Sequence, residues 1–405
     1  MTFHRKVLYA AGVALAALSY ASFGHAQSWG PRTLDELKQE TQRRADRNAP
    51  PVGGVKPEDV RAALAQVDNL QPDTWANAYI RVGDQYLARA KTAEATAPAE
   101  ARELYHRAWE TYNLGRWPTE NSPAKKQAYA KALEAFAAYG KLMDPPIEVV
   151  RIPYEGKGIV GYLRVPKARP APLVFGISGL DSRKEDVAAG SDSYISNGIA
   201  VFAVDMPGTG QAPVKVDVGA EHMFSRALDQ LLARPEIDGK RVIVQGRSWS
   251  GYWAATMGYT ERNRLRGVVV QGGPVHAYFT AEWQKKALTT PEYLFDLFPA
   301  RSAIYDVATM EDFLAYGPRM SLVARGMIDK PSAPMLLVNG ERDTQVPIED
   351  LYLLMKHGDP KEAWVNPAGG HMGRSQGWSS RDISQRVVMP WILRRLGMPP
   401  AVARN

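Results

Sequence analysis

The residue with the clearest chemical potential, Ser248, lies where an apolar run meets a helical pattern. The surrounding segment, Gly246-Arg-Ser-Trp-Ser-Gly251, directly follows the apolar run Val242 to Gln245. Small residues on both sides of a serine permit a tight strand-to-helix turn that projects its hydroxyl, which is the nucleophile-elbow arrangement. Ser250 stands where such turns usually have their second glycine, and it is small enough for the turn. The segment therefore predicts that Ser248 is a nucleophile and not an ordinary turn serine.

A serine hydroxyl needs a neighbouring base at neutral pH, and His371 is the histidine best placed to be that base. It is the last histidine of the chain, in the loop Pro367 to Gly373 that follows a predicted strand. In proteins with an elbow of this type, the order along the chain is serine, acid, histidine. His371 is therefore the expected base, and His276, which follows another predicted strand, is the alternative.

Asp343 is the expected acid of the triad. It lies four residues beyond the apolar run Met335 to Asn339, within a loop of pattern Gly-x-x-Asp-x-x-x-Pro that ends at Pro347. Such an acid fixes the imidazole tautomer and stabilises the imidazolium that forms during catalysis. Glu341, in the same loop, is the alternative.

Acyl chemistry at a serine also requires an oxyanion hole, usually made of two backbone N–H donors. The first donor is expected from Trp249, the residue after the nucleophile. The second is expected from Gly179 or Leu180, in the loop that follows the predicted strand Leu173 to Ile177. These assignments predict acyl transfer that needs no metal and no organic cofactor.

The elements that would position these residues alternate between strand and helix from residue 146 to residue 400. Short apolar runs of this kind suit strands that are buried on both faces of a mostly parallel sheet. The predicted strands are 147–154, 159–165, 173–177, 199–204, 242–245, 267–271, 335–339 and 363–366. The predicted helices between them are 186–197, 219–234, 249–260 and 347–357. The expected fold class is α/β, with a doubly wound, mostly parallel sheet that begins with a hairpin.

Two further regions are expected to be helical and to surround the site. Residues 27–145 form an N-terminal domain, in which 75–93, 99–114 and 125–142 carry apolar residues at helical spacing. An insert at 275–330, after the sixth strand, is expected to form a lid over the active site.

The first 26 residues are expected to be a signal peptide. A positive start at His4 to Lys6 precedes an apolar stretch, and Gly24 to Ala26 provides small residues for cleavage after Ala26. The alternative is an N-terminal membrane anchor, for which the apolar stretch is short. The prediction is a periplasmic or secreted protein with no stable membrane insertion after cleavage.

Composition excludes several classes of site. The 405 residues contain no cysteine, which excludes disulfides, thiolate metal sites and a cysteine nucleophile. The formal net charge is +7, but basic residues alternate with acids, as in Arg183 to Asp186, which indicates a solvated surface and no nucleic-acid partner. The expected partner is a small carbonyl compound, and the sequence leaves open whether the chain forms a homodimer.

Five motifs together resemble one group of α/β hydrolases. They are Ser178 to Asp186, Asp205 to Gly210, Gly246 to Gly251, Asp343, and Gly370-His371. The group includes 2,6-dihydropseudooxynicotine hydrolase, the fermentation-respiration switch protein and fungal polyketide-shortening hydrolases. The resemblance covers about residues 70–396, and it implies that the N-terminal helices form a cap over the active site.

The resemblance also implies the reaction class. Several members of the group cleave a carbon–carbon bond beside a carbonyl, and others are esterases. Some members place an acidic residue of the insert near the substrate, and Glu282 is the nearest candidate in this chain. Members carry glycine where this chain has Ser250. The expected function is an exported serine hydrolase that cleaves a carboxylic ester through an acyl-enzyme. A carbon–carbon bond hydrolase and a non-catalytic binding protein on the same scaffold are the alternatives.

Overall fold

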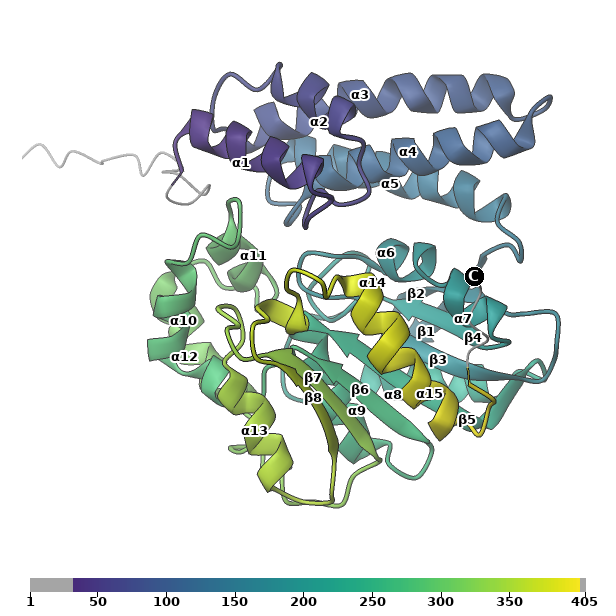
Figure 1. Ribbon diagram of the computed structural model, residues 1–405, viewed down its shortest axis with the longest axis vertical. Coiled ribbons are helices and arrows are strands. Elements are labelled where there is room, and N and C mark those ends of the chain that lie inside the picture. Colours follow the sequence, from purple (N-terminus) through teal and green to yellow (C-terminus); the bar gives the residue numbers. More distant parts are fainter. Residues whose placement is uncertain (1–31, 401–405) are drawn as a thin grey trace, which may run out of the picture.

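A computed structural model describes residues 32–400 of the chain. The expected signal peptide, residues 1–26, lies outside these described residues. Within them, no helix combines the length and the apolar character needed to cross a membrane. Helices α1–α5 form one layer, which lies across one side of a body built from a single sheet and its flanking helices (Figure 1).

The N-terminal layer is a helical cap packed around aromatic side chains. Its helices are α1 (Leu34–Asp46), α2 (Pro57–Leu64), α3 (Pro72–Ala93), α4 (Pro98–Arg116) and α5 (Pro123–Lys141). Proline opens four of them, where its missing N–H costs no hydrogen bond. Inward-facing rings of α3, α4 and α5 are fully or almost fully buried, among them Tyr79, Trp109, Tyr112 and Phe136. The three helices match the ranges expected from their periodicity.

The sheet has eight strands in the order β1-β2-β4-β3-β5-β6-β7-β8. The strands are β1 (Glu148–Tyr154), β2 (Lys157–Arg164), β3 (Ala171–Ile177), β4 (Ala200–Val204), β5 (Ile237–Arg247), β6 (Gly267–Gln271), β7 (Met335–Gly340) and β8 (Glu362–Asn366). Strand β2 pairs antiparallel with β1 and β4, and all other neighbours are parallel. The loops that follow β3, β5, β7 and β8 therefore meet at one edge of the sheet.

Helices cover both faces of this sheet, which confirms the expected α/β class. Alternate residues of β3 belong to different cores. Phe175 is in the same apolar cluster as Trp253 of α9, and Val174 is in the same apolar cluster as Trp391 of α15. The flanking helices are α6 (Lys184–Ala189), α7 (Asp192–Ser196), α8 (His222–Leu232), α9 (Gly251–Thr260), α13 (Ile348–Lys356), α14 (Ser380–Ile383) and α15 (Met389–Arg395).

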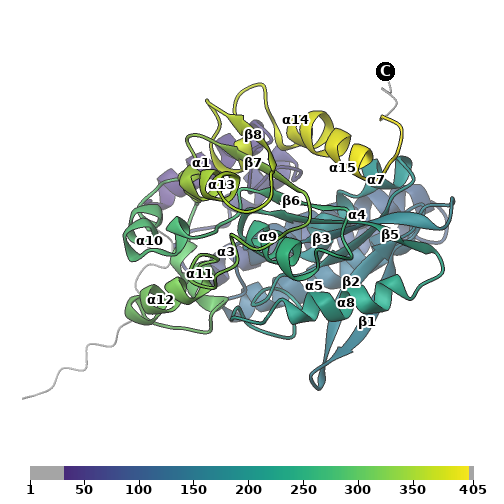
Figure 2. The same ribbon diagram turned by 90° about the horizontal axis from the view of Figure 1, so that it is seen from below.

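The segment between β6 and β7 folds into short helices that join the cap. They are α10 (Ala281–Leu288), α11 (Leu297–Ala303) and α12 (Met310–Tyr316), gathered beside one end of the sheet (Figure 2). Leu294 and Phe295 of this insert belong to the same apolar cluster as Trp75 and Trp117 of the cap region. Next to that cluster, cap and insert share a fully buried ion pair, Lys125 Nζ to Asp296 Oδ2 at 2.8 Å.

Candidate active site

The end of β5 turns sharply into a short 3-10 helix, η1 (Ser248–Ser250), and then into α9. Ser248 lies in the left-handed region at φ 56°, where a residue with a side chain is strained. A Cβ built on Gly246 would overlap the carbonyl oxygen of Ser250, so this position accepts only glycine. The Ser250 hydroxyl accepts a hydrogen bond from the Arg247 N–H at 2.8 Å and lies 2.9 Å from the Ile177 carbonyl oxygen, to which it donates. The serine that departs from the family pattern thus ties the turn to the end of β3.

The ring of His371 bridges the other two residues of the expected triad. Its Nε2 lies 2.7 Å from the Ser248 Oγ, and its Nδ1 lies 2.8 Å from the Asp343 Oδ2. His371 begins a short turn, η4 (His371–Gly373), after β8, while Asp343 follows β7. The structure therefore brings the three residues into one hydrogen-bonded chain at the carboxyl edge of the sheet, which is the geometry of a nucleophile, a base and an orienting acid.

Asp343 is held as a carboxylate by its surroundings. Its Oδ1 accepts hydrogen bonds from the backbone N–H of Gln345 at 2.7 Å and of Val346 at 3.0 Å. Burial alone would raise the pKa of Asp343, but His371 and these two N–H groups lower it below the ordinary value. An ionised Asp343 keeps the His371 Nδ1 protonated and leaves Nε2 free to accept the serine proton.

The pKa of His371 is raised above its ordinary value. Burial of the ring lowers the pKa, but the negative charge of Asp343 and, more weakly, that of Glu292 outweigh the burial. Arg374 acts in the opposite direction. A raised pKa is a property that would suit a general base.

The alternative base, His276, and the alternative acid, Glu341, form hydrogen bonds with residues outside the expected triad. His276 places its Nδ1 2.7 Å from the Ser321 Oγ, within the insert region. Glu341 is exposed, and its Oε2 accepts a hydrogen bond from the Tyr352 hydroxyl at 2.6 Å. The structure therefore does not join either residue to Ser248.

The loop after β3 lies directly against the nucleophile turn. A Cβ built on Gly179 would lie 3.6 Å from the Ser248 Cβ. The Gly179 N–H donates to the Ser182 Oγ at 2.8 Å, so Gly179 is not a free donor, contrary to one of the two expectations for this loop. The N–H groups of Leu180 and Trp249 meet no acceptor within residues 32–400, and both residues line the same cavity as Ser248. These two N–H groups are the pair available to an oxyanion.

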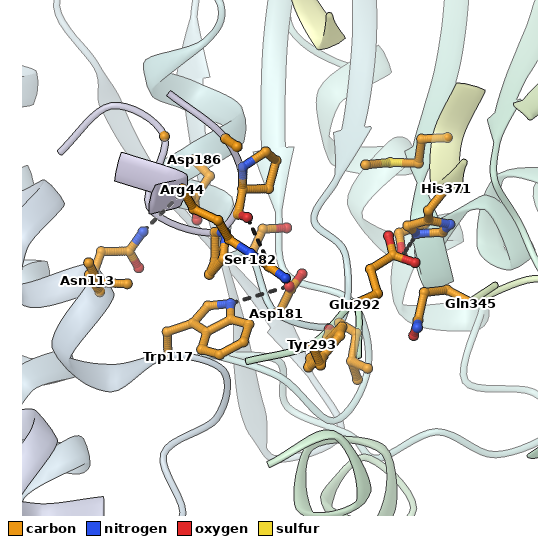
Figure 3. A pocket seen from close by; sticks show the side chains of 18 of the residues that line it. Arg44, Asn113, Trp117, Asp181, Ser182, Asp186, Glu292, Tyr293, Gln345 and His371 are labelled. Carbon is orange, nitrogen blue, oxygen red and sulfur yellow. Dashed lines mark hydrogen bonds between the residues drawn. The ribbon is translucent and has the colours of Figure 1, made fainter. Parts of the chain in front are cut away.

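The expected oxyanion loop, residues 178–183, and the start of α6 are held by the cap. Arg116 Nη1 donates to the Asp181 carbonyl oxygen at 2.7 Å, and Trp117 Nε1 donates to the Asp181 Oδ2 at 3.2 Å. A further bond at 2.9 Å joins the Asn113 amide to the Asp186 carboxylate (Figure 3). The end of α4 therefore fixes the backbone that follows Leu180. The local sequence does not predict this contact.

Cap, sheet edge and insert enclose a cavity of about 460 Å³ over the triad. Side chains from the cap, the oxyanion loop, the insert and the His371 loop surround it (Figure 3). Its lining includes charged, polar and aromatic side chains: Arg43, Arg44, Glu110, Arg116, Asp181, Ser248, Tyr278, Glu292, Arg301, Gln345, His371 and Arg374. Its size suits a small organic substrate.

The expectation for Glu282 was wrong. Glu282 is exposed on the first turn of α10 and does not line the cavity, because that helix buries Gln284 and Ala287 instead. The acidic residue of the insert that does line the cavity is Glu292. Its carboxylate accepts a hydrogen bond from the Thr344 hydroxyl at 2.6 Å and lies 3.8 Å from Arg374. Glu292 lies in an irregular connection between α10 and α11, where periodicity gives no guidance.

The described residues contain no group of three or more histidine and acidic side chains arranged to hold a metal ion.

Comparisons with known proteins confirm the expected resemblance. The family model described as "Esterase FrsA-like" matches residues 67–365. Esterase FrsA of Vibrio parahaemolyticus is 25% identical over 302 residues, which are 72% of this chain and 70% of that protein. Esterase FrsA of Vibrio cholerae is 26% identical over 301 residues, with the same two shares.

Solved structures share the fold, including its helical N-terminal region. The 2,6-dihydroxy-pseudo-oxynicotine hydrolase superimposes with a TM-score of 0.72 at 21% identity, covering 87% of this chain and 97% of that one. AbyA5 superimposes with a TM-score of 0.68 at 21% identity, covering 91% and 96%. At these identities the likeness shows an α/β-hydrolase fold.

Proposed function

The chain belongs to the FrsA-like esterase family and is a hydrolase of the α/β type, and from this premise we propose that it cleaves carboxylic esters through Ser248. The observation that carries the proposal is the continuous hydrogen-bonded chain from Ser248 through His371 to Asp343. A free serine hydroxyl is a weak nucleophile. The hydrogen-bonded series would supply the base, His371, and the group that orients this base, Asp343.

The first half of the reaction forms an acyl-enzyme. His371 Nε2 takes the proton of the Ser248 hydroxyl as Oγ attacks the ester carbonyl carbon. The N–H groups of Leu180 and Trp249 stabilise the negative oxygen of the tetrahedral intermediate. The intermediate collapses as the bond to the leaving oxygen breaks, and the imidazolium of His371 gives its proton to that oxygen. The alcohol then departs.

The second half regenerates the serine. Water enters the cavity, His371 takes one of its protons, and the resulting hydroxide attacks the acyl carbon. The bond to Ser248 Oγ breaks, Oγ recovers the proton from His371, and the carboxylic acid leaves. Asp343 stays ionised throughout and stabilises the imidazolium in both halves.

A fluorophosphonate probe tests the proposal directly. We expect it to label the wild-type protein covalently and to leave Ser248→Ala unlabelled. Hydrolysis of p-nitrophenyl butyrate by the same two proteins should fall by at least about 1000-fold in the variant. Failure of the folded wild-type protein to react with the probe would favour a binding protein on a hydrolase scaffold.

Substrate pairs then separate ester from carbon–carbon cleavage. A carbon–carbon hydrolase uses the same triad but must protonate a carbon leaving group, so it would act on a 1,3-diketone in preference to a p-nitrophenyl ester. We expect the ester to be the faster substrate. Turnover of the diketone alone would assign the protein to the second class.

We also propose that the protein is exported and cleaved after Ala26, because residues 1–26 combine a basic start, an apolar stretch and a small-residue cleavage site. The mass of the protein recovered from the periplasm of an expressing Gram-negative host tests this. Recovery of the uncleaved chain in the membrane fraction would indicate an anchor instead.

A further inference from the structure

One arginine of the active-site cavity differs from the others in its partners. Arg301 lies on α11 of the insert, and only 2% of its surface is exposed. Its Nη1 donates to the Gln284 Oε1 at 2.9 Å and its Nη2 to the Gln345 Oε1 at 3.0 Å. The guanidinium carbon lies 5.2 Å from the centre of the Tyr278 ring. All three partners are uncharged.

The remaining arginines of the cavity are all paired with carboxylates. Arg43 and Arg44 bind Glu40 at 2.6 and 2.7 Å, Arg116 lies 3.8 Å from Asp186, and Arg374 lies 3.8 Å from Glu292. Arg301 has no carboxylate within 4.0 Å in the described part of the chain, and its buried Nε–H has no acceptor there. Arg301 is thus the one cavity arginine whose charge the described protein leaves uncompensated.

Burial of a guanidinium without a counter-charge is unfavourable, so buried charges in proteins are almost always paired. The four carboxyl groups of the cavity do not supply the missing charge. Burial raises the pKa of Glu110 to about 8, so this group is mostly uncharged at neutral pH. Asp186 and Glu292 lie near Arg116 and Arg374, and the Asp181 carboxylate accepts a hydrogen bond from Trp117. None of these three carboxylates forms an ion pair with Arg301 in the described part of the chain. The lining of the cavity therefore includes one buried guanidinium that has no ion-pair partner and one N–H without an acceptor among the described residues.

Arg301 is connected through one residue to the loop that carries Asp343. Its partner Gln345 donates its own backbone N–H to the Asp343 Oδ1, so only one residue separates Arg301 from the triad acid. Gln345 and Tyr278 line the cavity together with Ser248. A substrate whose ester lies at Ser248 would have a second part of its structure next to this guanidinium.

We propose that Arg301 binds a carboxylate of the substrate, and that the preferred substrates are esters carrying a second, ionised carboxyl group. A guanidinium matches the planar carboxylate with two parallel N–H donors, and such charge-assisted bonds are stronger than neutral ones. The two glutamine oxygens and the Tyr278 ring fix the plane of the guanidinium in advance. This inference rests on the proposed ester hydrolysis at Ser248.

Matched pairs of esters test the proposal in the wild-type protein. One pair places the charge in the acyl part, p-nitrophenyl hemiglutarate against its neutral methyl ester. The other places it in the alcohol part, meta-acetoxybenzoate against methyl meta-acetoxybenzoate. We expect kcat/KM to favour the anionic member of at least one pair by about 10-fold or more, the usual value of a hydrogen bond to a charged group. A smaller preference in both pairs would overturn the proposal.

Variants then assign the preference to Arg301. Arg301→Met should abolish the preference, and Arg301→Lys, which keeps the charge but loses the two-pronged geometry, should retain part of it. Arg164→Met is the matched control, because it removes an equally buried arginine that Asp192 already compensates and that lies at the end of the sheet away from the triad. We expect this control to keep the wild-type ratio between the two esters.

The outcomes separate the inference from the proposed function. If Arg301→Met lowers kcat/KM equally for both esters of a pair, Arg301 acts by stabilising the oxyanion or by positioning the Asp343 loop. This result would contradict carboxylate recognition. If Arg301→Met fails to fold, the wild-type ratio alone decides. Efficient hydrolysis without preference for the anion overturns only the role of Arg301. Absence of hydrolysis together with an unlabelled Ser248 overturns both.

Discussion

Replacement of Arg116 by methionine tests whether the cap takes part in catalysis. Arg116 lies at the end of α4 and is 1% exposed. Its guanidinium donates to the Asp181 carbonyl oxygen at 2.7 Å, the Asn113 Oδ1 at 2.8 Å and the Pro118 carbonyl oxygen at 3.3 Å. Methionine keeps most of the stem of the side chain and removes all three donors.

From the structure we expect this substitution to lower both the free energy of unfolding and kcat. The three acceptors lose their donor inside the protein, so the free energy of unfolding should fall by about 3–5 kcal/mol. Asp181 directly follows Leu180, whose N–H we assign to the oxyanion hole. Complete loss of one such donor lowers kcat by about 100-fold or more. Because Asn113 and Trp117 still hold the loop, we expect a decrease in kcat of about 10- to 100-fold, and a smaller change in KM.

Steady-state hydrolysis of p-nitrophenyl butyrate gives kcat and KM, and urea unfolding gives the stability. Arg164→Met is the matched control, since Arg164 is 2% exposed and also donates to backbone carbonyl groups, those of Asp144 and Pro145. It lies opposite Val201, at the end of the sheet away from the triad. The control should lose stability but keep kcat. A folded Arg116→Met protein with wild-type kcat would refute the view that the cap positions the oxyanion loop.

Three further changes follow from the site. Glu292→Gln should move the acid limb of the pH profile of kcat/KM to lower pH, because His371 is active only when neutral and Glu292 raises its pKa. Arg374→Gln should move the same limb to higher pH, because Arg374 lowers that pKa; shifts in one common direction would contradict the electrostatic assignment. Gly246→Ala should cost several kcal/mol of stability or prevent folding, since its methyl group would overlap the Ser250 carbonyl oxygen. Thermal unfolding measures this loss, and a stable, active variant would show that the turn can relax.

The centre of the sheet could be predicted because its strands β3, β4, β6 and β7 are buried on both faces. Continuous apolar runs such as Leu173 to Ile177 have no competing periodicity, and each of the eight predicted runs overlaps an observed strand. Strand β5 begins five residues earlier than expected, because its first part includes the polar residues Asp238 to Arg241. The apolar pattern does not indicate helix α1, since this helix is mostly polar and begins with a capping box made by Thr33 and Glu36.

The three residues of the hydrogen-bonded chain could be named from the sequence because each lies in the turn or loop that follows a strand of a mostly parallel sheet. The loops that follow parallel strands lie at the same edge of the sheet, so the topology alone brings these three residues together. Glu292, Arg301 and Arg116 could not be found in this way. Their places depend on how the insert and the cap dock, and this docking is decided by contacts between side chains that are distant in sequence. The wrong choice of Glu282 has the same origin, because Glu282 lies on α10 while Glu292 lies in the irregular connection that follows this helix.

The buried ion pair between Lys125 and Asp296 has a consequence for how molecules reach the serine. Opening the protein by swinging the helical layer away from the insert would expose two unpaired charges and the aromatic cluster beside them, which is a costly route. A second hollow shares Arg43, Arg44 and Glu292 with the active-site cavity and leads to the surface between α1 and the insert. If substrates enter through this hollow, the residues around its entrance would select them by size and charge before any bond is broken. Attempts to widen the substrate range would then begin at the rim residues and leave the joint between cap and insert intact.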